Sequence, residues 1–211
     1  MSDSTIWESL LAAMKSLHWT ETGAVIFGIA YVVLAAREKV ACWFWGIISC
    51  GLWAYASFEL YKLWVDAALQ LFYVGMGFWG LYSWKFGGKR RQKLAIRVLP
   101  FPQHLKIFAA GIFLALLFGY FFDNYTPAAA TYLDSFTTIF AIIATFLVVR
   151  KILENWLYWI VIDALYTYLY LSRGAYLFAL LMATYTLIAI AGFYIWKKEF
   201  LKEQDFRFDK R

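Results

Sequence analysis

The stretch NWLYWIVIDALYTYLY, which runs from Asn155 to Tyr170, decides how the chain has to be interpreted. It is apolar enough to lie in a bilayer, yet Asp163 stands in its middle. A carboxylate at the centre of a membrane helix costs ~2.5–3.5 kcal/mol on insertion scales, so such a residue usually has a function. On a helix, one face carries the acid together with an amide and aromatic rings: Asn155, Trp159, Asp163, Tyr166 and Tyr170. We expect this face to be the wall of a binding site for a cationic aromatic solute.

The composition of the whole chain agrees with a membrane location. Of the 211 residues, 63% are hydrophobic and 16% are charged, whereas soluble domains contain ~45–50% apolar and ~25% charged residues. Backbone groups in lipid must be hydrogen-bonded within the protein, which favours helices. Aromatic residues make up 22% of the chain, more than interfacial belts alone need, so some rings are expected to line a site. The sequence therefore predicts an all-α integral membrane protein.

Seven apolar segments follow a first, amphipathic helix at residues 3–18. In that first helix an apolar stripe faces one way and charged residues face the other, so we expect it to lie on the bundle or in the membrane interface. The seven segments are predicted to be transmembrane helices, although several are shorter than the ~20 residues usually needed. Their ranges are 22–36, 40–58, 67–84, 107–122, 135–149, 155–172 and 174–196.

Basic residues gather after the third apolar segment and predict the orientation of the chain. The loop there contains Lys85, Lys89, Arg90, Arg91, Lys93 and Arg97. Because basic loops stay in the cytoplasm, we expect this loop inside, the N-terminus outside and the C-terminus inside. The formal net charge of +6 is then a topology signal, and nucleic acid is not an expected partner.

The chain also contains an internal repeat. A shift of 113 residues aligns Arg37 with Arg150 and Trp43 with Trp156, and after one gap GLYSWK (80–85) aligns with GFYIWK (192–197). One further helix separates two copies of three helices, so the copies are parallel, a 3+1+3 arrangement that in transporters places the solute between the halves. The predicted parts are an N-terminal helix (1–20), a first repeat (21–86), a basic loop with a linker helix (87–130), a second repeat (131–198) and a charged tail (199–211).

Candidate site residues come from three of these segments. The second contributes Trp53, the third Gln70 and Tyr73, and the sixth Asn155, Trp159, Asp163 and Tyr166. Asp163 balances a positive solute, bonds a neighbouring helix or couples to a proton. An aromatic ring there either faces a cation, worth ~0.5–2 kcal/mol, or simply packs. The two amides either contact the solute or bond between helices. In the repeat, Asp163 corresponds to Cys50, so the site is predicted to be one-sided.

Several kinds of chemistry are not indicated by the sequence. Cys42 and Cys50 lie on one helix and are too far apart along it for a disulfide. No cluster has the spacing of metal ligands. The chain contains no HExxH, GxSxG, Walker or CxxC pattern. We therefore predict no enzyme activity, no metal or other cofactor and no ATP hydrolysis by this chain.

Three blocks of sequence resemble the PnuC family of vitamin-precursor transporters over nearly the whole chain: VDAALQLFYVGMGFWGLYSW (65–84), VRKILENWLYWIVIDALY (149–166) and AGFYIWKK (191–198). The resemblance implies a SWEET-like fold, a homotrimer in the bacterial inner membrane, and facilitated diffusion with trapping of the vitamin by a cytoplasmic kinase. Members typically carry nicotinamide riboside, and relatives carry thiamine or riboflavin. Residues that match the family's motif, and are implied to line the site or its gate, are Gln70, Asn155, Trp156 and Trp159.

The sequence leaves open which solute is carried and which class of membrane protein this is. Nicotinamide riboside is the leading solute, and thiamine, which has two aromatic rings and one positive charge, is the alternative. A different class is a solute-binding membrane subunit that needs a separate motor. Another is a membrane scaffold without a ligand, for which an Asp163→Leu change would be harmless.

Overall fold

The computed structural model describes residues 3–88, 92–125 and 131–208. Apart from one isolated bridge between Arg97 and Ile152, the regular structure in these residues is helical, so the all-α prediction is confirmed. The elements are α1 (Asp3–Ser16), α2 (Trp19–Ala36), α3 (Cys42–Tyr55), the π-helix η1 (Ala56–Leu60), α4 (Trp64–Phe86), α5 (Phe101–Tyr125), α6 (Thr131–Val149), α7 (Asn155–Ser172) and α8 (Tyr176–Phe208).

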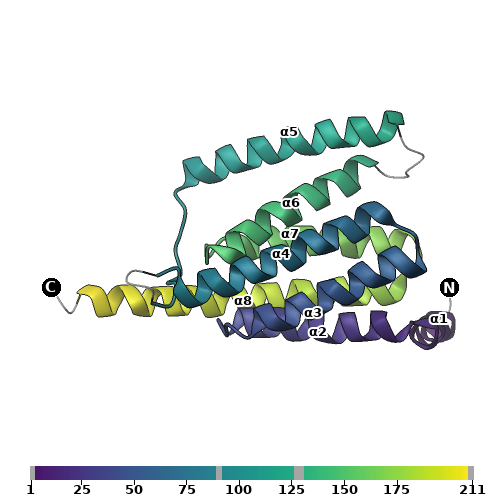
Figure 1. The fold of residues 1–211 in the computed structure, drawn as a ribbon, viewed down its shortest axis with the longest axis horizontal. Coiled ribbons are helices and arrows are strands. Elements are labelled where there is room, and N and C mark those ends of the chain that lie inside the picture. Colours follow the sequence, from purple (N-terminus) through teal and green to yellow (C-terminus); the bar gives the residue numbers. More distant parts are fainter. Residues whose placement is uncertain (1–2, 89–91, 126–130, 209–211) are drawn as a thin grey trace.

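Most of the predicted apolar segments lie inside a somewhat longer helix, because polar residues extend the helices beyond the apolar windows. The largest difference is at the C-terminus, where the predicted tail from residue 199 continues α8 as far as Phe208. Lysine and glutamate are good helix formers, and the Lys202 ammonium lies 2.8 Å from the Glu199 carboxylate one turn away. Figure 1 shows this end of α8 reaching past the other helices.

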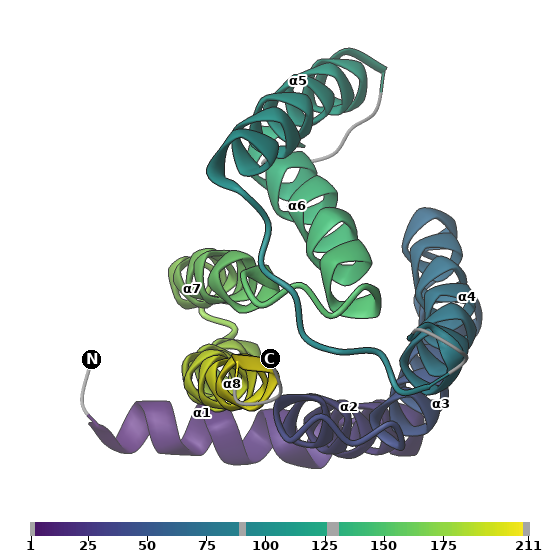
Figure 2. The same ribbon diagram turned by 90° about the vertical axis from the view of Figure 1, so that its left-hand side faces the viewer.

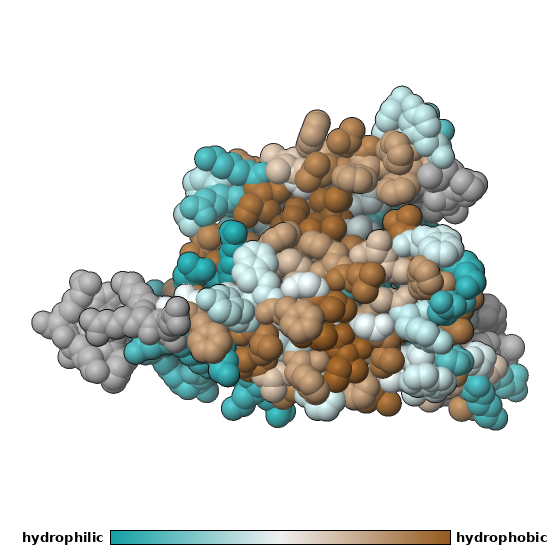
Figure 3. Space-filling model, viewed as in Figure 1, coloured by the Kyte–Doolittle hydropathy of each residue, from teal (hydrophilic) through white to brown (hydrophobic). Residues whose placement is uncertain are grey.

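Four of the described helices are long and apolar enough to cross a membrane: Trp19–Ala36, Phe101–Tyr125, Tyr132–Val149 and Tyr176–Asp205. The α-helical part of α3 has only 14 residues, and α7 contains Asn155, Asp163 and several tyrosines, which lower its hydropathy. Hydrophobic side chains form a broad band across the middle of the molecule, with hydrophilic groups toward both ends (Figure 3). This distribution is that of an integral membrane bundle.

The bundle consists of two groups of three helices, which we call the first half (α2–α4) and the second half (α6–α8). The halves meet where α2 packs on α8 and α4 packs on α6, while α5 packs on α6 at the outside (Figure 2). Residues 92–100, which lead into α5, cross the end of the bundle from which α8 extends (Figure 1). They are fixed there because the Arg97 N–H donates to the Lys151 carbonyl at 2.9 Å and the Leu153 N–H donates to the Arg97 carbonyl at 2.8 Å. Residues 89–91 and 126–130, which belong to the predicted part with the basic loop and the linker helix (87–130), lie outside the described residues.

Two tryptophans join the halves through matching hydrogen bonds. The Trp84 indole N–H of the first half donates to the Val148 carbonyl of the second at 3.0 Å. The Trp196 indole N–H of the second half donates to the Ala35 carbonyl of the first, also at 3.0 Å. Both indoles are fully buried. Each half therefore inserts a side chain from its third helix against the end of the other half's first helix.

Each of these tryptophans also meets a second indole within its own half. Trp43 packs edge-on against Trp84, with ring centroids 5.4 Å apart and planes at 88°. Trp156 meets Trp196 in the same way, at 5.5 Å and 89°. A Cβ at Gly80 would lie 2.4 Å from Trp43 and a Cβ at Gly192 would lie 2.8 Å from Trp156, so both close approaches require glycine. This explains physically why GLYSWK and GFYIWK share the glycine and the tryptophan.

Candidate functional site

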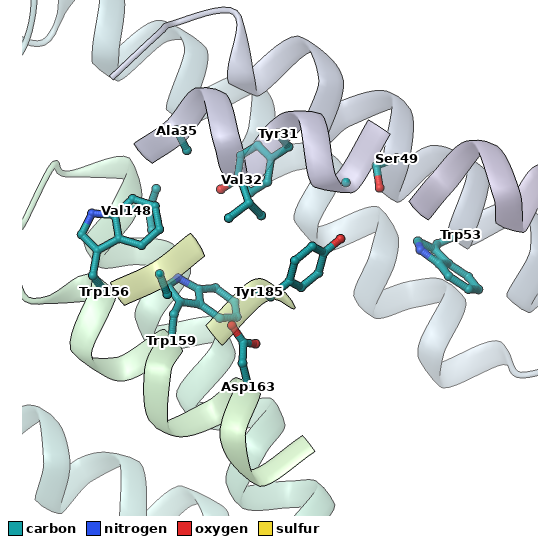
Figure 4. A pocket seen from close by; sticks show the side chains of 12 residues that line it. Tyr31, Val32, Ala35, Ser49, Trp53, Val148, Trp156, Trp159, Asp163 and Tyr185 are labelled. Carbon is teal, nitrogen blue, oxygen red and sulfur yellow. The ribbon is translucent and has the colours of Figure 1, made fainter. Parts of the chain in front are cut away.

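A cavity of about 220 Å³ lies between the two halves. Five helices contribute to its wall: α2 with Gly28, Tyr31, Val32 and Ala35; α3 with Ser49 and Trp53; α6 with Val148; α7 with Trp156, Trp159 and Asp163; and α8 with Tyr185 and Ala189. Figure 4 shows these side chains converging from both halves. The size and the mostly apolar wall suit one small molecule, because such sites combine hydrophobic and aromatic side chains with a few polar groups.

Asp163 supplies the charge of this cavity. Its side chain is only 5% exposed, and its carboxylate points from α7 into the space between Trp159 and Tyr185 (Figure 4). Among the described lining residues there is no lysine, arginine or histidine, and no described residue donates a hydrogen bond to the carboxylate. A buried carboxylate without a partner is costly, so a positive solute would stabilise the site.

The first wall of the cavity follows from the helical period of α7. Trp159 precedes Asp163 by four residues and therefore projects from the same face. Trp156, one turn earlier, is 3% exposed and its indole N–H has no hydrogen-bond partner among the described residues. That nitrogen is itself buried, so Trp156 contributes the face of its ring to the wall.

The opposite wall consists of residues that sequence reasoning did not select. Tyr185 comes from α8 and Tyr31 from α2, and a Cβ at Gly28 would lie 2.6 Å from the Tyr185 hydroxyl. Glycine at this position therefore leaves room for that hydroxyl. The signal in the sequence is the spacing of Gly28, Tyr31, Val32 and Ala35, which places them on one face of α2.

The structure brings four of the eight predicted site residues to the cavity: Asp163, Trp159, Trp156 and Trp53. Asn155, Gln70, Tyr73 and Tyr166 are not among the residues that line it. Asn155 is fully buried at the start of α7, where its amide donates to the Ile152 carbonyl at 2.6 Å. Tyr166 packs against a cluster that includes Phe140 and Ile162, and Gln70 and Tyr73 are half-buried on α4. A contact between these four and the solute stays a prediction.

Comparison with known proteins gives a consistent result. The sequence model of the family described as "Nicotinamide mononucleotide transporter" matches residues 18–198. The nicotinamide riboside transporter PnuC of Escherichia coli is 26% identical over 205 residues, covering 85% of both chains. The protein of the same name from Neisseria mucosa is 28% identical over 153 residues, 70% of this chain and 57% of that one.

A solved structure has the same fold. The crystal structure of the vitamin B3 transporter PnuC superposes with a TM-score of 0.72 at 24% identity, covering 93% of this chain and 90% of the other. Because the family match spans most of the chain, the chain belongs to the nicotinamide mononucleotide transporter family, whose members are integral membrane transporters and not enzymes.

Proposed function

We propose that this protein takes up nicotinamide riboside by facilitated diffusion. The names of its relatives support this solute, and the observation that carries the proposal is the unpaired Asp163 carboxylate in an aromatic cavity. The nicotinamide ring of the riboside is a planar cation. A carboxylate and aromatic faces both attract such a ring, and each cation–π contact is worth ~0.5–2 kcal/mol.

The charge of the cavity favours the riboside over the mononucleotide that the family description names. A phosphate monoester adds about −1.5 to −2 charges near neutral pH. The described lining residues offer it no cation and place Asp163 inside the same cavity. The phosphate and the Asp163 carboxylate would both be negative and would lie in one cavity, and like charges repel strongly in a low-dielectric interior. The phosphorylated form is therefore expected to bind far more weakly.

We also propose that α2 to α8 make seven crossings in a parallel 3+1+3 arrangement, with α5 as the linker helix. The matching tryptophan contacts of Trp84 and Trp196 support the repeat. The basic residues near the end at which α8 leaves the bundle support an N-terminus outside and a C-terminus inside. The domain limits are those of the two repeats, 21–86 and 131–198, joined by residues 87–130.

We also propose an oligomeric state, a membrane location and a means of retaining the vitamin in the cell. A homotrimer in the bacterial inner membrane is proposed from the resemblance to the family, and the exposed rings of α5, such as Phe113 at 66%, offer an apolar surface to lipid or to a neighbouring copy. The sequence carries no nucleotide-binding loop, so net uptake is proposed to depend on a cytoplasmic kinase that phosphorylates the vitamin. The phosphate then prevents its return through a cavity that disfavours negative charge.

Titration calorimetry of the purified protein tests the solute. We expect nicotinamide riboside to bind, and nicotinamide mononucleotide and riboflavin to bind much more weakly. Thiamine is the informative competitor, because its cationic ring also suits Asp163. Tighter binding of thiamine than of the riboside would replace the proposed solute, and no binding of any of them would favour a scaffold.

Liposomes that contain only this protein test the mode of transport. We expect labelled riboside to equilibrate across the bilayer, at the same final level with and without a pH gradient. Accumulation that requires the gradient would contradict facilitated diffusion. Binding without any transport would indicate a subunit that needs a separate motor.

A further inference from the structure

The first helices of both halves end in the same kind of turn. Glu38 follows α2 with φ 54° and Lys151 follows α6 with φ 51°. Positive φ is uncommon for residues other than glycine, so both turns are specific features. The Lys151 ammonium meets the Glu38 carboxylate at 2.6 Å, and this contact ties the tip of one half to the tip of the other.

Lys151 is an unusual lysine because it is fully buried. Its ammonium lies 4.7 Å from the centre of the Trp84 ring and 5.9 Å from that of Trp196. Burial lowers the pKa of Lys151 below its ordinary value, and the hydrogen bond that its ammonium donates to the Glu38 carboxylate acts in the opposite direction. A buried charge costs several kcal/mol unless it is paired, so both the glutamate and the two rings are needed to keep it there. The solute cavity does not use this group.

The ion pair lies directly beyond one end of the cavity. Ala35 and Val148 line the cavity, and Glu38 and Lys151 each follow three residues later. The carbonyls of Ala35 and Val148 are the ones that accept the Trp196 and Trp84 indole N–H groups. Ala35 and Val148 are each 2% exposed, and both tryptophans are 0% exposed. Buried residues from both halves therefore lie between the cavity and the ion pair.

We propose that the Glu38–Lys151 pair, together with Trp84 and Trp196, is a latch that closes the solute cavity on the predicted cytoplasmic side and separates when the solute is released. The proposal rests on transport by this protein but not on the identity of the solute. A movement of one half against the other must break this pair, because each half supplies one charge. The two hydrogen bonds from the indoles cross the same boundary and break with it.

The native Cys42 offers a direct reporter of the latch. It is the first residue of α3, is 0% exposed, and becomes the only cysteine of the chain after Cys50→Ala. Inverted membrane vesicles expose the predicted cytoplasmic side to a membrane-impermeant maleimide. In the Cys50→Ala background we expect slow labelling, and about tenfold faster labelling after Lys151→Met. Glu38→Gln should also accelerate the reaction.

Lys93→Met is the matched control. Its ammonium lies 3.9 Å from the Glu38 carboxylate, but the side chain is 59% exposed, so its loss should leave labelling unchanged. Lys151→Arg should label as slowly as the parent, because it keeps a cation beside Glu38 and the two rings. Glu38→Lys should label fast, because it places a second cation beside Lys151.

Two results would overturn the latch. One is a folded Lys151→Met protein, judged by unchanged gel-filtration elution, that labels at the parental rate. The other is an equal acceleration by Lys93→Met. If Lys151→Met does not fold, Glu38→Gln decides, since labelling at the parental rate would then contradict the latch. Labelling requires no solute, so a failure to bind nicotinamide riboside would count against the proposed function alone.

Discussion

The first half, α2–α4, and the second half, α6–α8, use the same contacts for packing but present different side chains to the cavity. Trp43 and Gly80 in one half have the same relation as Trp156 and Gly192 in the other. At the cavity the correspondence ends. Asp163 aligns with Cys50, which does not line the cavity, and Trp159 aligns with Gly46.

Gly46 shows how the first half uses its smaller residues. A Cβ at this position would lie 2.9 Å from the Tyr31 ring, so glycine admits a tyrosine from α2 where the second half places an indole. The difference between the halves teaches that they share a packing frame, whereas the acidic group among the described lining residues comes from the second half. The predictions below test first the shared frame and then the one-sided site.

The largest expected effect concerns the frame. Trp84→Ala and Trp196→Ala should each lower the free energy of unfolding by ~3–5 kcal/mol, because a buried ring and an interhalf hydrogen bond are lost together. Denaturant unfolding in detergent measures this loss. Trp19→Ala is the control, since Trp19 is 69% exposed. A large loss for only one of the two buried tryptophans would break the equivalence of the halves.

The glycines under the indoles give a smaller effect of the same kind. Gly80→Ala and Gly192→Ala should each destabilise by ~1–3 kcal/mol, because the new methyl group would overlap Trp43 or Trp156. Gly51→Ala is the matched control, since a Cβ there meets nothing within 4 Å. Thermal melts of the three variants compare them directly. Stability of Gly80→Ala or Gly192→Ala equal to that of Gly51→Ala would argue against the tight packing.

At the cavity, the comparison predicts that tryptophans from the two halves contribute unequally to the free energy of riboside binding. Trp159→Leu should weaken riboside binding by ~0.5–2 kcal/mol, the range of a cation–π contact. Trp53→Leu should weaken it less, because Figure 4 shows Trp53 apart from the cluster formed by Trp159, Asp163 and Tyr185. Calorimetry of both variants measures the difference. A larger loss of affinity in Trp53→Leu than in Trp159→Leu would indicate that the solute lies closer to the first half.

The smallest effects on stability are expected at the end of the bundle opposite the Glu38–Lys151 pair. The Tyr61 hydroxyl donates to the Glu21 carboxylate at 2.5 Å, and Arg173 lies 3.9 Å from Asp134 in the second half. Tyr61→Phe should cost about 1 kcal/mol of stability, and Arg173→Gln about 0–1 kcal/mol because that pair is exposed to solvent. Melting curves check both. An effect of either change that exceeds those of the glycine variants would contradict this order.

Much of the frame could be predicted from the sequence because it depends on local patterns. Apolar segments, basic loops and the spacing of glycine and tryptophan can each be recognised within a short stretch of sequence. The structure has a helix for each predicted apolar segment. The continuation of α8 to Phe208 was not predicted, because charge suggested a tail although the residues are good helix formers.

The site was harder to predict because it is made by helices that are distant in sequence. Asp163 and Trp159 were found because a polar group in an apolar helix is conspicuous. Tyr31 and Tyr185 were missed, since a tyrosine in an aromatic-rich helix gives no sign of which neighbour it faces. Asn155 was predicted for the site on its chemistry, whereas its amide bonds to the Ile152 carbonyl in the turn before α7. The Glu38–Lys151 pair depends on two turns meeting across the halves, which no local pattern indicates.

The central claim is that one half of a shared frame recognises a cationic solute through Asp163. Calorimetric titration of nicotinamide riboside into the parent protein, Asp163→Asn and Cys50→Ser tests it most directly. The account predicts that Asp163→Asn weakens binding by ~1–3 kcal/mol, the range of a hydrogen bond to a charged group, and that Cys50→Ser changes it by less than about 0.5 kcal/mol. Unchanged affinity in Asp163→Asn, or an equal loss in Cys50→Ser, would contradict it.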